Sequence, residues 1–390
     1  MPTRIPSAKI YLDHAATTPV DPRAAALMQS LGNEKFANPN SSYLLGQESR
    51  RAVEDARRKI SKILNCAPGE LIFMGGGTEA DNLAIKGFAY SNQDRGRHII
   101  TSTIEHHAVL RTCQYLERRG FTVTYLSVDS TGLVDAHDVK KALRPDTILV
   151  SIMHANNEIG TVQPIAEIGA LLAETEVYFH TDAVQTVGHL PVDVQKLNVD
   201  LLSFSAHKFY GPKGVGGLYM RRGTVIDPLI HGGGQEHDLR SGTENVAGIA
   251  GMGLALEIAS EFLEEEATRL SRWRDRLIKE ILQRIEGARL TGHPTERLPG
   301  TVSFCFENVD GESIILKLDL EGICASTGAA CHAGEISPSH VLLALGLEPT
   351  LANGSLRLTL GRTNSASDLD CVLEILPKAI QNLRAMSAAH

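Results

Sequence analysis

The sequence lacks three features that would each point to a broad class of protein. No apolar run approaches the roughly 20 residues of a membrane span, and residues 1–13 contain no apolar core of a secretion signal. There is no basic excess either, because the formal net charge is -8. We therefore expect a cytoplasmic protein with no membrane partner and no nucleic-acid partner.

The cysteines also lack a pattern, since no two of the six form a C-x-x-C pair. Neither a disulfide framework nor a zinc site is expected, and we predict no bound metal. The default for each thiol is a small buried hydrophobe. Helical or strand patterns around Cys113, Cys305 and Cys324 suit burial.

The chain has 390 residues, of which 43% are hydrophobic and 22% are charged, as in an ordinary globular protein. This length favours a large domain with at least one smaller one. Between residues 70 and 220, β-rich runs alternate with helical patterns, which is typical of a mainly parallel sheet with helices on both faces. The predicted strands cover residues 71–74, 99–102, 123–128, 148–153, 177–180, 201–205 and 216–220.

We predict an α/β fold in which a large domain, residues 15–255, contains a mainly parallel seven-stranded sheet flanked by helices. A smaller α+β domain would be built from residues 1–14 and 256–390. Apolar residues three or four apart predict one long helix over residues 254–285 between the two domains.

Two segments of the large domain could face a ligand. The run Gly75-Gly76-Gly77-Thr78-Glu79 follows a strand and opens a helix, so it is either a phosphate site or a plain strand-to-helix turn. Asp182 ends an apolar strand, where ligands of open α/β sheets bind. An aspartate that caps a loop is the alternative.

Lys208 follows an apolar strand and precedes a glycine-rich turn, in Ser205-Ala-His207-Lys208-Phe-Tyr-Gly211. This position suits a partly desolvated amine that acts as a nucleophile, whereas an exposed loop lysine is the alternative. Cys331 lies among small residues, glycines and a proline, which indicates an exposed loop and a reactive thiol.

Two further side chains have open interpretations. His106, in Glu105-His106-His107, could ligate a metal or stack on a ring, although no second ligand set at a zinc spacing supports the metal. Arg357 alternates with apolar residues on a strand, and it either extends to a sheet edge or binds a carboxylate in bidentate fashion.

Together these segments resemble the cysteine desulfurases of the class V aminotransferase group, which are fold type I pyridoxal-phosphate enzymes. The resemblance extends from Tyr11-Leu-Asp-His-Ala-Ala-Thr-Thr-Pro19 to the last helix. Its strongest elements are His154-Ala-Asn-Asn157-Glu-Ile-Gly160, Ser205-Ala-His-Lys208 with Tyr210-Gly-Pro-Lys-Gly214, and His231-Gly-Gly-Gly-Gln-Glu236 with Arg240-Ser-Gly-Thr243-Glu-Asn245.

The resemblance implies a role for each matching residue. Lys208 would tether pyridoxal 5'-phosphate, Asp182 would pair with the ring nitrogen, and His106 would stack on the ring and act as acid or base. The resemblance assigns the remaining cofactor contacts to Gln185 and Asn157 at the ring edge and to Gly77, Thr78, Ser205, His207 and a second subunit's Thr243 at the phosphate.

The same resemblance implies the substrate and the partners. Arg357 would hold the carboxylate of L-cysteine with help from Asn38, whose loop departs from the commoner Gly-Asn-Pro-Ser pattern. Cys331 matches the cysteine that accepts sulfur in the long-loop group, and its persulfide would pass to an acceptor such as an iron–sulfur scaffold protein. The active form would be a homodimer.

Two other readings of the chain stay open. The Gly-Ala-Ala-Cys-His sequence around Cys331 also resembles the loop of selenocysteine lyases, so selenocysteine is an alternative substrate. An aminotransferase of the same fold is a further alternative. The alternative from a different functional class is a protein without catalytic activity that supports an iron–sulfur or tRNA-thiolation assembly. The joint presence of Lys208, Asp182, His106 and Cys331 argues against it.

Overall fold

The computed structural model describes residues 9–328 and 338–387. Its largest element is a seven-stranded sheet in which only the second strand in spatial order, β8, runs antiparallel to its neighbours. The expected mainly parallel sheet is therefore confirmed. In spatial order its strands are β2 (Leu71–Met74), β8 (Gly216–Met220), β7 (Leu201–Ser205), β6 (Tyr178–Asp182), β5 (Thr147–Ser151), β3 (His98–Ser102) and β4 (Thr122–Leu126).

Helices bury both faces of this sheet, as the near-continuous apolar strands predict. Successive residues of β7, Leu202 and Leu201, belong to different hydrophobic clusters on the two faces. The first face is covered by α1 (Pro22–Asn33), α2 (Leu44–Leu64), α6 (Ala136–Ala142), α7 (Ile165–Leu172), α8 (Val194–Leu197) and α9 (Val246–Glu261). The second is covered by α3 (Gly77–Asn82), η2 (Leu83–Gly87), α4 (Phe88–Ser91) and α5 (His107–Glu117).

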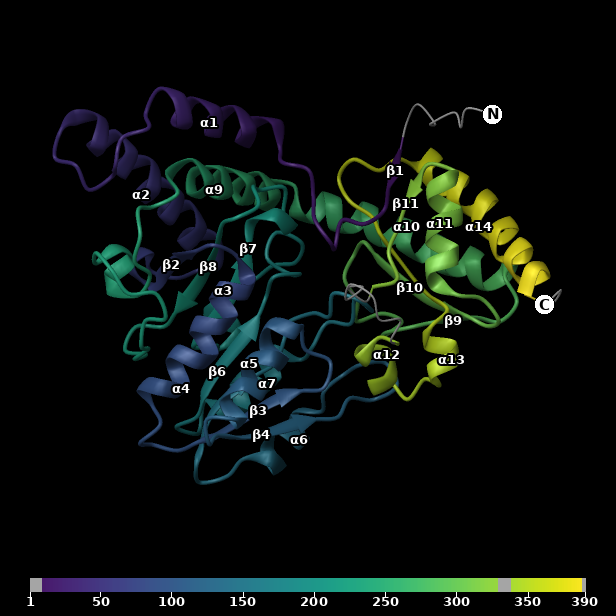
Figure 1. The fold of residues 1–390 in the computed structure, drawn as a ribbon, viewed down its shortest axis with the longest axis horizontal. Coiled ribbons are helices and arrows are strands. Elements are labelled where there is room, and N and C mark those ends of the chain that lie inside the picture. Colours follow the sequence, from purple (N-terminus) through teal and green to yellow (C-terminus); the bar gives the residue numbers. More distant parts are fainter. Residues whose placement is uncertain (1–8, 329–337, 388–390) are drawn as a thin grey trace.

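Residues 9–11 and most of the described residues from 263 onward form the smaller α+β unit, which lies beside the sheet-containing unit in Figure 1. Its antiparallel sheet has the order β12-β10-β9, and the N-terminal strand β1 pairs in parallel with β11. Its elements are β1 (Ile10–Tyr11), α10 (Leu263–Arg284), β9 (Ala288–Leu290), β10 (Thr301–Phe306), α11 (Gly311–Leu320), β11 (Ile323–Cys324), α12 (His340–Ala344), α13 (Pro349–Ala352), β12 (Ser355–Thr359) and α14 (Ala366–Ser387).

The single helix predicted over residues 254–285 is wrong. The chain instead forms α9 and α10, which are bent by 68° at Phe262. The two helices belong to different cores, since α9 packs on the large sheet and α10 on the smaller unit, so a straight helix would leave one of them uncovered. The domain boundary at residues 255 and 256 stays a prediction.

Within the described residues, no single helix is long and apolar enough to cross a membrane. The bent pair α9 and α10 meets the length and composition test only when its two helices are taken together.

Candidate active site

A cavity of about 350 Å³ lies where strands of the large sheet end and the smaller unit begins. Parallel strands present their carboxyl ends at one edge, so the residues that follow them meet there. Ten residues predicted from the sequence line this cavity: Gly77, Thr78, His106, Asn157, Asp182, Gln185, Ser205, His207, Lys208 and Arg357.

Lys208 enters the cavity from the short 3-10 turn η3 (Ala206–Lys208), directly after β7. Its Nζ donates hydrogen bonds to the backbone oxygens of Ala15 at 2.6 Å and Ala16 at 2.8 Å. Burial and the nearby Arg357 charge lower the pKa of the Lys208 amine to about 8, although Asp182 and Asp13 oppose this shift. A substantial fraction of the amine is therefore neutral near physiological pH.

Asp182 ends β6 and faces the same cavity, with 6% of its surface exposed. Its Oδ1 accepts a hydrogen bond of 2.9 Å from the backbone N–H of Val184. Burial raises the pKa of the carboxyl to about 6, while that hydrogen bond and the Lys208 charge lower it. An amine and an acid with perturbed pKa values thus share one cavity, which is typical of a catalytic site.

His106 caps the N-terminus of α5, and its Nδ1 accepts a hydrogen bond of 3.1 Å from the backbone N–H of Ala108. This contact requires an unprotonated Nδ1, so the neutral ring carries its proton on Nε2. Desolvation, Lys208 and His340 all lower the pKa of His106, which favours this neutral form.

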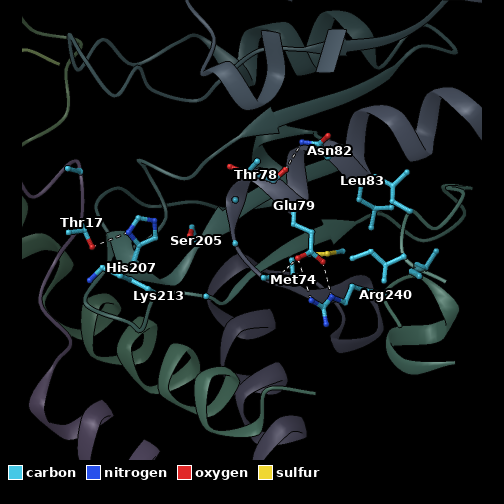
Figure 2. A pocket seen from close by; sticks show the side chains of 18 residues that line it. Thr17, Met74, Thr78, Glu79, Asn82, Leu83, Ser205, His207, Lys213 and Arg240 are labelled. Atoms are coloured by element: carbon cyan, nitrogen blue, oxygen red, sulfur yellow. Dashed lines mark hydrogen bonds and ion pairs between the residues drawn. The ribbon is translucent and has the colours of Figure 1, made fainter. Parts of the chain in front are cut away.

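The glycine run after β2 forms a turn that opens α3. Gly76 has a φ of 156°, which side chains rarely adopt, and a Cβ on Gly77 would lie 2.6 Å from Val184 Cγ2. Beside this turn a second cavity of about 780 Å³ is lined by Thr78, Ser205 and His207 (Figure 2). Backbone N–H groups and hydroxyls at a helix start provide the donors that a phosphate needs.

Arg357 reaches the cavity from β12 of the smaller unit and is 4% exposed. Its Nη1 donates to the backbone oxygen of Asn157 at 2.8 Å, and its Nη2 donates to Asp13 Oδ1 at 2.7 Å. Its buried Nε has no hydrogen-bond partner among the described residues. The guanidinium is thus held in place with donor capacity left for a carboxylate.

Three predicted residues are not among those that line this cavity. Asn38 is exposed, and its side chain accepts a hydrogen bond from the backbone N–H of Asn40. Thr243 is also exposed. Cys331 lies outside the described residues.

Sequence reasoning missed two carboxylates at the site. Asp81 lines the cavity from α3, and Asp13 pairs with Arg357. Both belong to segments that were noted for other residues, Asp81 just after the glycine run and Asp13 in the N-terminal motif. Only the folded chain brings them to Asp182 and Arg357.

The described residues include no group of three or more side chains suited to hold a metal ion.

The donor set fits pyridoxal phosphate. A lysine amine of lowered pKa, a buried aspartate for a ring nitrogen and a glycine turn for a phosphate line adjoining cavities. Asn157 and Gln185 also line the smaller cavity and provide polar groups for a ring edge. The residues present thus suit the cofactor's aldehyde, ring nitrogen, phosphate and polar ring edge.

Comparison with known proteins agrees with this geometry. The family model described as Aminotransferase class-V matches residues 10–372. The chain belongs to this family. The family member cysteine desulfurase IscS of Dictyoglomus turgidum is 54% identical over 379 residues, which cover 97% of this chain and 96% of the relative.

Two solved structures extend the comparison within the family. A NifS-like protein has a TM-score of 0.90 and 41% identity, covering 96% of this chain and 100% of that one. A structure titled "SspA in complex with cysteine" has a TM-score of 0.80 and 38% identity, covering 90% of this chain and 98% of that one. The predicted family, fold, enzyme class and pyridoxal-phosphate dependence are therefore confirmed.

Proposed function

We propose that this class V enzyme removes sulfur from L-cysteine, giving L-alanine and a persulfide on Cys331. The observation that carries the proposal is the meeting of Lys208, Asp182 and Arg357 at one cavity. A reaction at the α-carbon of an amino acid requires a base for the α-proton, an electron sink and a group that binds the carboxylate. Lys208 suits the first, Asp182 supports a cofactor ring as the second, and Arg357 suits the third. The solved relative in complex with cysteine supports the choice of substrate.

Each residue has a chemical task in this proposal. The bound cofactor supplies an electron sink for the substrate's α-carbon. The Lys208 amine would tether the cofactor and would then accept the α-proton, and Asp182 would hold the ring nitrogen in its protonated state. Neutral His106 stacks on the ring and exchanges protons through Nε2. Arg357 orients the substrate carboxylate, assisted by Asn38.

The Cys331 thiolate attacks the substrate's sulfur, so the C–S bond breaks and a new S–S bond forms on the protein. The carbon skeleton leaves as alanine after it gains protons. A persulfide is a transferable form of sulfur, so we propose an acceptor such as an iron–sulfur scaffold protein in the cytoplasm. Cys331 lies outside the described residues, and its assignment rests on the sequence.

We further propose a homodimer in which Thr243 of a second copy completes the phosphate site. Thr243 is exposed and is not among the residues that line the two cavities described above. Large apolar side chains are also exposed before and at the start of α2: Phe36 is 70%, Tyr43 58% and Leu44 65% exposed. Such a group of apolar side chains is typical of a surface that a partner covers.

A product assay on wild-type protein and on Lys208→Ala tests this function. We expect wild-type protein with bound cofactor to convert L-cysteine into alanine and, with a thiol reductant, sulfide. Lys208→Ala should lose the visible absorbance of the tethered cofactor and about 10²-fold or more of the alanine production. Lys196→Ala, an exposed lysine on α8, is the matched control and should behave as wild type.

Three outcomes would contradict the proposal. An unchanged visible spectrum in Lys208→Ala would show that Lys208 does not tether the cofactor. The keto acid that keeps the sulfur of cysteine, mercaptopyruvate, in place of alanine would indicate an aminotransferase. Release of selenide from selenocysteine without sulfide from cysteine would indicate a selenocysteine lyase.

A further inference from the structure

Three acidic side chains are buried at or next to the candidate active site: Asp81 and Asp182 line its cavity, and Glu105 accepts hydrogen bonds from the lining residue Met153. Asp81 is 1%, Glu105 is 0% and Asp182 is 6% exposed. Burial raises the pKa of all three carboxyls, and Asp182 adds to the shift of both Asp81 and Glu105 by repulsion. Ionising all three in this space would cost far more than leaving at least one protonated.

The hydrogen-bond donors are distributed unevenly over the three carboxyls. Glu105 accepts from Ser102 Oγ at 2.5 Å and from the backbone N–H of Met153 at 3.0 and 3.1 Å. Asp182 accepts from the backbone and is attracted by Lys208. By contrast, Oδ1 of Asp81 accepts no hydrogen bond from the described part of the chain. A hydrogen bond with Ser203 favours the ionised form of Asp81, but no cation is among the groups that lower the pKa of this carboxyl, and burial and the repulsion of Asp182 outweigh the hydrogen bond. Asp81 is therefore the carboxyl whose ionised form is least supported.

A chain of polar side chains leads away from Asp81 through the sheet. The Ser203 hydroxyl lies close enough to Asp81 for hydrogen bonding to lower the pKa of that carboxyl, against the larger effect of burial. Ser203 Oγ lies 3.0 Å from His180 Nε2, and His180 Nδ1 lies 2.8 Å from Ser151 Oγ. Burial lowers the pKa of His180 to about 3, so its ring is neutral and cannot balance a charge on Asp81. The 3.7 Å from His180 Nε2 to Asp81 Oδ1 is too long for a hydrogen bond.

We propose that Asp81 is a positioning residue whose carboxyl stays protonated, so that Asp182 is the ionised carboxylate that faces the cofactor ring. The side chains of Ser203, His180 and Ser151 fix the orientation of the protonated carboxyl. The inference deepens the proposed function and rests on it for the role of Asp182. A neutral acid beside Asp182 supplies a polar neighbour without a second negative charge. Two adjacent carboxyls thereby take different protonation states because only one of them faces a cation.

Infrared difference spectroscopy on the cofactor-loaded protein at pH 7 tests the protonation state directly. Wild type minus Asp81→Asn should show the carbonyl stretch of a protonated carboxylic acid, a band that an ionised carboxylate lacks. Asp193→Asn is the matched control, because hydrogen bonds lower the pKa of this N-cap aspartate and its spectrum should lose only carboxylate bands. A difference spectrum for Asp81→Asn that contains only carboxylate bands would overturn the proposal.

The pH titration of the cofactor's visible absorbance is a second readout. If Asp81 is neutral, Asp81→Asn removes no charge and keeps the wild-type midpoint. If Asp81 is ionised, its loss should shift the midpoint by about one unit or more, and this result would overturn the proposal. Loss of cysteine turnover in the wild type would contradict the proposed function but would leave the infrared band of Asp81 unchanged.

Ser203→Ala keeps the inference testable even where Asp81→Asn does not fold. This variant retains the acid of Asp81 and removes its hydrogen-bond partner. We expect the acid carbonyl band to remain and to move to higher frequency, as for an acid with a weaker hydrogen bond. A band at the wild-type position, or no acid band in wild type, would overturn the inference.

Discussion

Lys208 differs from an ordinary surface lysine in that its amine is partly desolvated and lies next to a second cation. Burial and Arg357 both disfavour the ammonium form, and the lowered pKa of about 8 is the net result after Asp182 and Asp13 oppose them. The neutral amine is the form that attacks a carbonyl group and accepts a proton. The same local environment thus serves both tasks proposed for this residue.

The pH dependence of cofactor attachment follows from this shift. The folded-state pKa is lowered from 10.5 to about 8, so the neutral amine predominates above about pH 8. We expect the rate at which cofactor-free protein gains visible absorbance with pyridoxal phosphate to rise as the pH increases through about 8. Stopped-flow absorbance across pH 6.5 to 11 measures the midpoint.

Arg357→Gln provides the matched perturbation for that experiment. Removing the neighbouring positive charge should raise the pKa of Lys208 and move the midpoint to higher pH. A wild-type midpoint near 10.5, or one that moves to lower pH in Arg357→Gln, would contradict this account of the amine.

At the scale of elements, the turn between β2 and α3 depends on two glycines with different constraints. Gly76 has a backbone conformation that side chains rarely adopt, whereas Gly77 lacks room because Val184 packs against it. Val184 follows Asp182 closely in the chain. The segments proposed to bind the cofactor's phosphate and its ring nitrogen therefore pack on each other.

Gly77→Ala should weaken the binding of pyridoxal phosphate about tenfold or more, because its Cβ would force the turn or Val184 to move. Gly32→Ala in α1 is the control, since a Cβ there meets nothing within 4 Å and should stabilise the helix. Spectroscopic titration of cofactor-free protein measures both affinities. Wild-type affinity in Gly77→Ala would show that the close approach to Val184 is unimportant.

Much of the site could be predicted from the sequence because its residues directly follow apolar strands. Lys208 after β7 and Asp182 at the end of β6 occupy the positions where α/β sheets place ligand contacts. Asp81 could not be assigned in this way, since its place in the same cavity as Asp182 depends on how α3 packs on the sheet. The bend at Phe262 was missed because apolar spacing continues from α9 into α10 while the core beneath changes.

At the scale of the whole molecule, the candidate site combines two units. The large sheet supplies Lys208 and Asp182, while the smaller unit supplies Arg357. A cluster of apolar residues from both units, including Met153 and Val341, packs between them close to the cavity. The residues proposed to hold the cofactor and the substrate carboxylate therefore come from two units that pack on each other through apolar side chains.

Subunit complementation tests the proposed homodimer. Lys208→Ala and Thr243→Leu should each be defective alone, the second through loss of a hydrogen bond to phosphate that changes affinity about tenfold or more. A heterodimer of the two variants contains one site with an intact Lys208 and a partner's intact Thr243. Co-expression should therefore restore activity toward half of wild type, and no restoration would place Thr243 with the site of its own chain.

The central claim, transfer of sulfur from cysteine to Cys331, is tested most directly by a single turnover without reductant. We expect about one alanine per chain and one added sulfur atom on the peptide that contains Cys331, found by mass spectrometry. Cys331→Ala should keep the visible cofactor spectrum and form no alanine, whereas Cys324→Ala should behave as wild type. Alanine formed at the wild-type rate by Cys331→Ala would contradict the account.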